Sequence, residues 1–402
     1  MKTKTQLTGR HWETGSVHNA LAMQGVKAPH TGKPYSEALL LGISGGITFG
    51  YFTFEYKGYL PHVAILTRNT FDPFSTMLER LGIAQDLQQT SKPEIAEKNL
   101  QDTLESGLYP LTWADQFSLP YNDLKSDAAM WGMMPLLVIG SDGKSVTVAD
   151  RSSQPLNLSM ADLTRARGRV KEDKYRLMTI DAPQPTKLAG AVQKGISQAI
   201  ALFTEKPPRG ARDNFGFAAY AKLAELLVNT RNKHSWERQF APGVRMYHAL
   251  AGSPVQPGAY QWVNTWVTAD GADRGVYADF LVEAAQILKK PALEESAEKF
   301  RQSYKLWLKF AEALLPDAVP MLGESKKLIQ KKHDLFIQKG EAALPEIKQI
   351  NTRLNELLEL SKTDFPLSNA QAAELRSNLR DVLLKISAVE QTAIDLLQNA
   401  IM

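Results

Sequence analysis

The chain has 402 residues, of which 44% are hydrophobic and 22% charged, with 26 glycines and 21 prolines. This composition is typical of a globular protein of two or three domains, and it excludes collagen and extensive disorder. The net charge of +4 is too small to create the positive surface that nucleic-acid binding needs, so DNA and RNA are not expected partners. The absence of cysteine excludes disulfides, thiolate metal sites and a cysteine nucleophile.

The sequence shows no targeting or membrane segment. No apolar stretch follows the N-terminal lysines, as a secretory signal would require. The longest apolar run, 133–139, is interrupted by Pro135 and is far shorter than the roughly 20 residues that cross a bilayer. These absences predict a cytoplasmic protein that has no membrane partner.

The first part of the chain mixes short β-like runs with helices. Helices are predicted over 12–24 and over 35–41, the second ending before Gly42. Two β-rich runs within 134–150 flank the pair Asp142-Gly143, which predicts a hairpin with a tight turn of positive φ.

A turn centred on that pair has a consequence for the other end of the hairpin. It places Pro135 near Asp150, so Met133, Met134 and Asp150 are expected to gather at the open end.

The loop 181–185, with two prolines in five residues, marks the end of the mixed region. Beyond it, apolar residues recur at helical spacing, which predicts helices over 188–203, 215–227, 274–288 and 293–315. Ser368 and Gln371 form a capping box that opens a last helix. The apolar stripe of the terminal helices either covers the preceding helical domain, which we favour, or mediates self-association into a homo-oligomer.

Several motifs point away from common site types. The glycines at 42, 45, 46 and 50 are not followed by the Gly-Lys-Ser/Thr of a phosphate loop, so close backbone approach or positive φ is the favoured explanation. The seven histidines form no HxH, HxxxH or HExxH pair, and no Gly-x-Ser-x-Gly elbow is present. We therefore expect no metal and no cofactor. A basic cluster over 165–171 is either a solvated face or a dock for an acidic partner.

Three segments together resemble the butirosin biosynthesis protein H family. They are Gly9-Arg-His-Trp-Glu-Thr-Gly15, the stretch from Tyr35 to Tyr51 that contains Gly-Ile-Ser-Gly-Gly, and Val148-Ala-Asp-Arg-Ser152. Further segments around 214–216, 236 and 274–285 resemble the helical C-terminal domain that accompanies it, so the resemblance covers about residues 8–315.

The resemblance implies a fold and a reaction. The fold is an α+β, papain-like N-terminal domain over 1–182, followed by an all-α domain over 187–318 and a helical extension over 319–402. The reaction is aminoacyl or peptidyl transfer from a carrier-protein thioester to an amine, through a Cys-His-Asp arrangement, in bacterial natural-product pathways. Such chemistry needs a thiolate, an imidazole that activates it and a carboxylate that orients the imidazole.

This chain departs from the family at two of those three positions. Trp12 stands where the family has its nucleophile, and Met133, or alternatively Met134, stands where it has its histidine. Asp150 alone matches the triad. Neither an indole nor a thioether can take over the lost role, because the first is not nucleophilic at neutral pH and the second cannot carry a proton.

Other residues near these positions are candidates for binding or residual chemistry. Ser16 lies one helical turn after Trp12, with His11 or His18 as its base, and Glu13 with Asp150 is a candidate carboxylate pair. Glu37 is more simply a hydrogen-bond acceptor near the glycine-rich loop. The candidate substrate-binding residues are His11, Glu13, Ser16, Glu37, Gly45, Gly46 and Arg151.

The sequence thus predicts a catalytically degenerate transferase relative. Its expected partner is an acyl carrier protein or an active relative, with an acyl or amine small molecule as ligand. The alternatives are an active acyltransferase or cyclase that uses residues other than a thiol, and an architectural interaction protein.

Overall fold

The structure is a computed structural model that describes residues 6–124, 130–266 and 268–401. The described residues group into two compact units that interleave along the chain. The segments up to residue 40, 74–188 and 332–349 make up the first unit, and those over 41–73, 189–331 and from 350 onward make up the second. The division into 1–182, 187–318 and 319–402 stays a prediction, although the first unit's middle segment ends at Leu188, just after the predicted loop 181–185.

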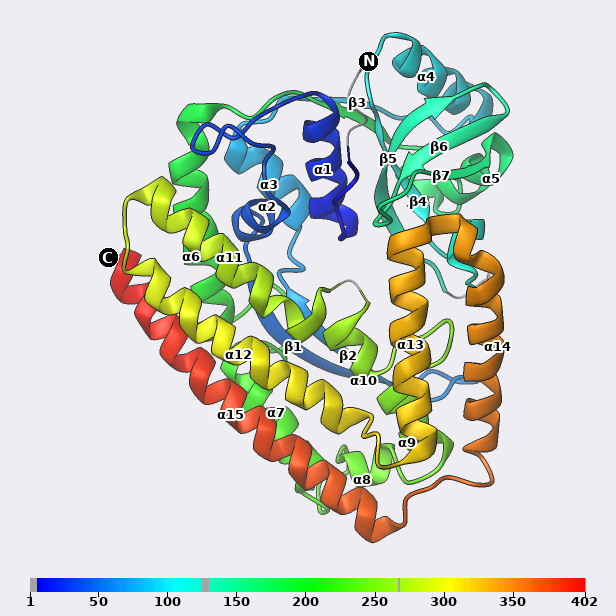
Figure 1. Ribbon diagram of the computed structural model, residues 1–402, viewed down its shortest axis with the longest axis vertical. Helices are drawn as coiled ribbons and strands as arrows, with labels where there is room; N and C mark the ends of the chain where they lie inside the picture. Colours follow the sequence, from blue (N-terminus) through cyan, green and yellow to red (C-terminus); the bar gives the residue numbers. More distant parts are fainter. Residues whose placement is uncertain (1–5, 125–129, 267, 402) are drawn as a thin grey trace. The chain divides into compact units, whose positions relative to one another are not determined.

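The described part of the first unit contains a six-stranded antiparallel sheet in the order β3-β8-β4-β5-β6-β7 (Figure 1). A cluster of buried hydrophobic side chains on this sheet includes Leu136, Val138, Val146 and Val148 from the predicted hairpin. The strands are β3 (Gln85–Gln88), β4 (Leu111–Asp115), β5 (Met133–Ser141), β6 (Ser145–Ala149), β7 (Leu156–Ser159) and β8 (Leu177–Ile180).

The predicted hairpin is confirmed as β5 and β6. The Asp142 carboxylate accepts hydrogen bonds from the backbone N–H groups of Lys144 and Ser145, and Gly143 has the expected positive φ of 86°. A register shift between Val138 and Gly140 then places Ala149 opposite Leu137. Asp150 therefore follows on the position opposite Leu136, one residue from the predicted Pro135. The turn is centred between residues 143 and 144, which moves the register by two residues from the prediction, and the extra residue of the bulge in β5 restores one of them.

The helices of the first unit flank this sheet. They include α1 (Trp12–Met23), α3 (Pro73–Leu81), α4 (Pro93–Glu105) and α5 (Met160–Arg167), with short 3₁₀ turns η1 (Pro120–Asn122), η2 (Lys171–Asp173), η3 (Pro185–Lys187) and η6 (Gly340–Ala343). Helix α1 confirms the prediction over 12–24 and packs against β5. Helix α2 (Glu37–Ile43) begins two residues after the predicted start because the Ser36 hydroxyl accepts from the N–H of Leu39, and it includes Gly42.

The second unit combines one β-hairpin with helices. The hairpin joins β1 (Ile47–Phe54) to β2 (His62–Arg68) and lies in the region expected to mix strands and helices. The predicted helices over 188–203, 215–227, 274–288 and 293–315 are confirmed. The helices are α6 (Leu188–Thr204), α7 (Gly216–Val228), α8 (Trp236–Gln239), α9 (Val244–Ala251), α10 (Ala259–Asn264), α11 (Arg274–Leu288), α12 (Leu293–Leu314), α13 (Pro320–Lys339), α14 (Leu344–Leu360) and α15 (Asn369–Ile401), with 3₁₀ turns η4 (Arg212–Asn214) and η5 (Asp270–Asp273). The end of α13 and the start of α14 belong to the first unit.

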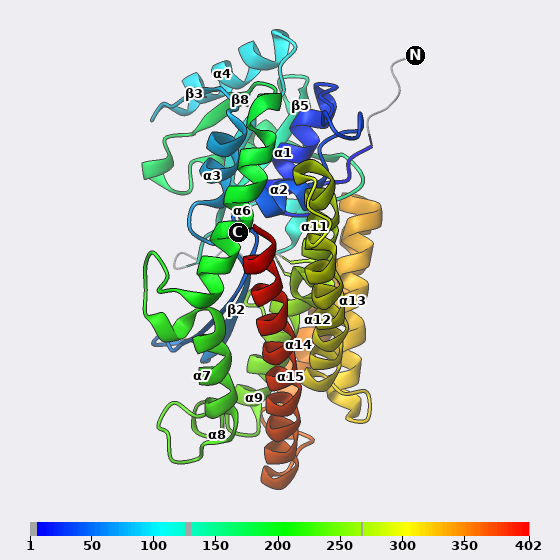
Figure 2. The same cartoon turned by 90° about the vertical axis from the view of Figure 1, so that its left-hand side faces the viewer.

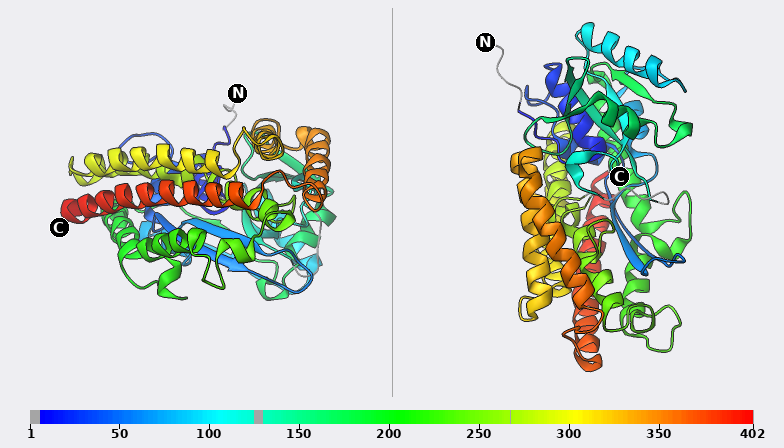
Figure 3. Two further views of the ribbon diagram at one scale, coloured as in Figure 1. Left: turned by 90° about the horizontal axis from the view of Figure 1, so that it is seen from below. Right: turned by 90° about the vertical axis from the view of Figure 1, so that its right-hand side faces the viewer.

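Helix α15 runs alongside α12 and α7 within the second unit (Figures 2 and 3). The predicted capping box is confirmed, since the N–H of Ser368 donates to Gln371 and the N–H of Gln371 donates to the Ser368 hydroxyl. The apolar stripe of α15 is buried inside the chain: Leu375, Leu379, Leu383, Ile386, Ala393 and Leu397. This stripe covers the chain's own core, so self-association stays a prediction that needs another surface.

A buried ion pair ties α15 to the core of the second unit. The fully buried guanidinium of Arg274 donates to both carboxylate oxygens of Glu390, over 2.7 and 3.0 Å. Ser303, Trp307 and Tyr220 also donate hydrogen bonds to Glu390. Every carboxylate oxygen thus has a partner, as a buried charge requires.

The architecture is therefore a mixed α/β N-terminal region followed by a largely helical region, as predicted. In the parts of the chain that the structure describes, no helix has the length and apolar character needed to span a membrane.

Candidate functional site

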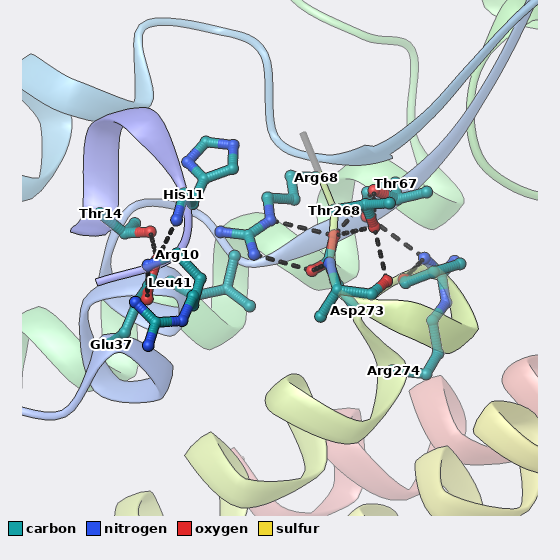
Figure 4. A network of polar contacts seen from close by, with 12 residues as sticks. Arg10, His11, Thr14, Glu37, Leu41, Thr67, Arg68, Thr268, Asp273 and Arg274 are labelled. Atoms are coloured by element: carbon teal, nitrogen blue, oxygen red, sulfur yellow. Dashed lines mark hydrogen bonds and ion pairs between the residues drawn. The ribbon is translucent and has the colours of Figure 1, made fainter. Parts of the chain in front are cut away.

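The candidate site begins at the N-terminus of α1, which a carboxylate holds in place. Glu37 accepts hydrogen bonds from the backbone N–H groups of Arg10 and His11, over 2.7 and 2.9 Å, and from the Thr14 hydroxyl over 2.8 Å (Figure 4). His11 is the N-cap residue, and its Nδ1 accepts from the N–H of Glu13 over 3.3 Å. A negative side chain at the positive end of a helix is favourable. These contacts fix Trp12 as the first residue of α1. Glu37 is half-buried and accepts hydrogen bonds, as predicted.

Asp150, directly after β6, lies in the same compact unit and is almost fully buried. Its Oδ1 accepts from Nε of Arg151 over 2.8 Å, and its Oδ2 accepts from Nη2 of Arg151 over 3.1 Å and from the Tyr121 hydroxyl over 2.9 Å. Nη2 of Arg151 also donates to the side-chain oxygen of Asn122 over 2.8 Å. Asp150, the acid of the predicted triad, is therefore hydrogen-bonded to an arginine and a tyrosine.

Arg151 connects this carboxylate to the residue at the nucleophile position. Its Cζ lies 4.6 Å from the ring centroid of Trp12 and 4.9 Å from that of Phe336, so the guanidinium lies over both rings. Such cation–π contacts stabilise by about 0.5–2 kcal/mol each. Arg151 has a left-handed φ of 55°, and its carbonyl accepts a hydrogen bond from the Arg10 side chain over 3.0 Å. Trp12, Asp150 and Arg151 thus form one cluster, called here the Arg151 cluster together with Tyr121, Asn122 and Phe336.

The protonation states of Arg151 and Tyr121 are fixed at neutral pH. Burial lowers the pKa of Arg151, but the attraction and hydrogen bonds of Asp150 outweigh it, so the pKa lies above its ordinary value. Burial and the negative charge of Asp150 raise the pKa of Tyr121 well above its ordinary value. Both groups therefore stay protonated, and neither can act as a base near pH 7.

The two methionines predicted at the base position lie at the start of β5. Met133 is opposite Asp115 of β4, and Met134 is opposite Ala114. Both are half-buried. Asp115 is itself held in a turn, where it accepts from the N–H of Gly132 over 2.9 Å. Their expected gathering with Asp150 stays a prediction.

The other candidates for residual chemistry are engaged elsewhere. The hydroxyl of Ser16 is buried and donates to the carbonyl oxygen of Pro135 over 3.0 Å. His18, one of its two predicted bases, has Nδ1 against the carbonyl oxygen of Tyr35 and Nε2 against the Thr8 hydroxyl, each over 2.6 Å. This arrangement holds α1 in place and gives no support to a serine nucleophile.

Gly45 and Gly46 belong to the second unit, so the structure does not add them to the Arg151 cluster. Both have positive φ, of 108° and 69°, as predicted for a turn after a helix. A Cβ on Gly45 would lie 2.5 Å from the Asn69 side chain, and one on Gly46 would lie 2.7 Å from the Tyr277 ring. Their role is to allow this turn and close approach, and a binding role stays a prediction.

The basic cluster over 165–171 is not one continuous charged face. Arg167 is buried and donates to the carbonyl oxygens of Ala96 and Tyr175, and burial lowers its pKa to about 10. Arg165 is exposed and forms an ion pair with Asp162 over 2.6 Å. This leaves less positive charge for an acidic partner than the sequence suggests.

Sequence reasoning missed three members of the Arg151 cluster: Tyr121, Asn122 and Phe336. Pro120 before Tyr121 signals a turn, but no local pattern connects residues 121, 151 and 336. Across residues 6–124, 130–266 and 268–401, no group of three or more His, Asp or Glu side chains is placed to hold a metal ion.

The comparison with protein families agrees with the motifs. The family model described as Butirosin biosynthesis protein H, N-terminal, matches residues 11–151, a range that includes Trp12, Asp150 and Arg151. None of the curated proteins matches the chain. The helical region beyond residue 187 lies outside the matched range, so its resemblance stays a prediction. Residues 11–151 of this chain are therefore similar to the N-terminal part of the butirosin biosynthesis protein H family.

Proposed function

We propose that this protein is a catalytically degenerate relative of the family's acyltransferases, with a papain-like N-terminal fold, that binds an acylated carrier protein rather than turning it over. The observation that carries the proposal is the position of the Arg151 guanidinium, over the ring of Trp12 and in two hydrogen bonds with Asp150. In a Cys-His-Asp triad the imidazole lies between the nucleophile and the carboxylate.

Arg151 contacts both Trp12 and Asp150, as the imidazole of a triad contacts the nucleophile and the carboxylate, but it cannot accept a proton as the imidazole does. A guanidinium carries no lone pair for a proton at neutral pH, and the pKa of Arg151 lies above its ordinary value. The indole of Trp12 has no nucleophilic atom that could form an acyl intermediate. Substitution of both partners therefore supports loss of turnover together with retention of a packed site.

An active enzyme that uses other residues is the main alternative. Ser16 donates to a backbone carbonyl, and both ring nitrogens of His18 are in contact with oxygen atoms. The Glu37 carboxylate is occupied by backbone N–H groups at the start of α1. These contacts favour binding over catalysis.

Turnover is tested with thiol release from an acyl-phosphopantetheinyl carrier protein. The chain has no cysteine, so every free thiol in the assay comes from the thioester. We expect no more than one equivalent of thiol per protein molecule with an amine acceptor present. Multiple turnovers that Ser16→Ala abolishes would establish the non-thiol enzyme and end the proposal.

Binding is tested by titration calorimetry with the same carrier protein in its acylated and unmodified forms. We expect measurable binding, and tighter binding of the acylated form. Absence of binding to both forms would contradict the proposal and leave an architectural role.

A matched variant tests the ancestry of the site. Trp12→Cys places a thiol at the first position of α1, next to Arg151, where helix dipole and guanidinium both favour the thiolate. Iodoacetamide should label it faster at pH 7 than it labels Trp131→Cys, whose side chain is 57% exposed. The double variant Trp12→Cys, Met133→His then tests the base position: labelling faster than in the single variant is expected if residue 133 reaches the thiol.

A further inference from the structure

Arg151 uses two of its three side-chain nitrogens inside the protein. Nε and Nη2 donate to Asp150, and Nη2 also donates to Asn122. Among the residues that the structure describes, none accepts a hydrogen bond from the third nitrogen, Nη1. Because Nε and Nη2 share one edge of the planar guanidinium, both N–H bonds of Nη1 point away from Asp150. The side chain is 19% exposed, so solvent reaches part of it.

Arg10 carries a second set of unused donors. Its Nη1 donates to the backbone carbonyl oxygens of Gly9 and Arg151, each over 3.0 Å, and to that of Leu7 over 3.4 Å. Its Nε and Nη2 donate to no group in the described part of the chain. The bond to Arg151 places the Arg10 guanidinium against the backbone of the residue whose own side chain carries the unused Nη1.

The charge of Arg10 is only partly compensated. Arg151 forms an ion pair with Asp150, whereas the Arg10 guanidinium forms none within residues 6–124, 130–266 and 268–401. The negative charge of Glu37 acts on Arg10, but that carboxylate accepts from two backbone N–H groups and from the Thr14 hydroxyl (Figure 4). Burial lowers the pKa of the half-buried Arg10 more than Glu37 raises it, which agrees with an incomplete counter-charge. Arg10 still remains a cation at neutral pH.

We propose that Arg10 and Arg151 form a binding site for a carboxylate that the ligand carries. The two guanidinium groups present N–H donors and no acceptor, so the complementary group is an oxyanion. A planar carboxylate matches the fork of a guanidinium. Its single negative charge balances that of Arg10, whereas a phosphate dianion would place excess negative charge near Asp150 and Glu37.

The position of Arg151 indicates which part of the ligand carries this carboxylate. Its Cζ lies 4.6 Å from the ring centroid of Trp12, the residue at the nucleophile position. In an enzyme of this kind the acyl group lies next to the nucleophile. The phosphate of a phosphopantetheine arm is at the far end of the arm from the thioester. The carboxylate therefore belongs to the acyl group.

This inference rests on the proposed function in one respect, namely that the ligand is an acyl thioester. Its test uses small thioesters without a carrier protein, so the two proposals can fail separately. Carrier-protein binding with no preference for a carboxylate would end this inference alone. Preference for a carboxylate among small thioesters, without carrier-protein binding, would end the proposed function alone.

The probes are the S-succinyl, S-glutaryl and S-adipyl thioesters of N-acetylcysteamine, titrated into the full chain by calorimetry. Three chain lengths allow for the unknown reach from thioester to carboxylate. Each acid is compared with the thioester of the same length that ends in a primary amide, which has a similar shape and no charge. At least one acid should bind about tenfold or more tightly than its amide, because hydrogen bonds to charged groups are stronger. Equal affinities in all three pairs would overturn the inference, and so would tighter binding of inorganic phosphate than of every acid.

Two variants and a control complete the test. Arg10→Gln removes the partly compensated cation and should bring acid and amide to within about twofold of each other. Arg10→Lys keeps the charge but not the fork, so it should retain only part of the preference. The control is Arg165→Gln, because Arg165 is exposed in the same unit and is paired with Asp162, and it should leave the preference unchanged. A preference that survives in Arg10→Gln, or that Arg165→Gln removes equally, would refute the site.

Discussion

Replacing Trp12 with alanine removes the ring on which the Arg151 guanidinium rests. The side chain is only 3% exposed, and burial of about 200 Å² of indole at about 25 cal/mol per Å² sets an upper bound of about 5 kcal/mol. Truncation of buried aromatic residues costs about 3–5 kcal/mol in general, and loss of the cation–π contact is part of that cost. We expect Trp12→Ala to lower the free energy of unfolding by about 4 kcal/mol.

The assay is urea unfolding followed by circular dichroism, with a thermal scan alongside. A loss of about 4 kcal/mol corresponds to a fall in Tm of about 8–16 °C for a unit of this size. The matched control is Trp131→Ala, because Trp131 is 57% exposed and its truncation should change stability by less than about 0.5 kcal/mol. Trp12→Phe keeps a ring under Arg151 and should recover at least half of the loss. Equal, small effects of Trp12→Ala and Trp131→Ala would refute the packing on which the site argument depends.

The remaining predictions concern the charges and the tight turn. Asp150→Asn and Arg151→Gln should each cost about 2–4 kcal/mol, and the double variant should cost less than the sum by at least about 1 kcal/mol; additive costs in urea unfolding would show that the pair is not coupled. Glu390→Gln should cost about 3–5 kcal/mol, whereas Arg353→Ala, in an exposed pair with Glu324, should cost less than about 1 kcal/mol. Burial raises the pKa of Glu390, but Arg274 and the hydrogen bonds outweigh it, so its pKa lies below the ordinary 4.5. The stability that this ionised group supplies is therefore fully present above about pH 4.5 and is lost as the pH falls through the folded-state pKa, so the decline below pH 4.5 should be shallower in Glu390→Gln; parallel curves would contradict the ionised pair. Gly46→Ala should cost at least about 1 kcal/mol more than Gly58→Ala, because both have positive φ but only Gly46 faces a ring at 2.7 Å; equal effects would exclude that contact.

Local features could be predicted from the sequence because their causes are local. The Asp142 carboxylate folds the turn that it belongs to, and Ser368 with Gln371 starts its own helix. Helix α1 was predicted at its true start, although the Glu37 carboxylate that caps it comes from 23 to 27 residues away. Apolar periodicity found the long helices for the same reason, since it reports the face that each helix buries.

The centre of the site could not be predicted because its causes are distant. Arg151 depends on a left-handed backbone, on Tyr121 and Asn122, and on Phe336, which is far along the chain. The sequence indicated a basic residue after the triad acid, but not that its side chain turns back onto Asp150. The burial of Glu390 was equally hidden, because a lone glutamate on a helix is normally solvated and only its buried partner Arg274 changes that.

The interleaving of the two units has a consequence for how the protein is made. A nascent chain emerges in sequence order, and domains generally fold as units during synthesis. Here the first unit needs residues 332–349 and the second needs Glu390. Neither unit can therefore be completed until most of the polypeptide has left the ribosome. Unfinished apolar surface of both units is therefore exposed until late in synthesis, and a premature stop codon before residue 332 would leave both units incomplete.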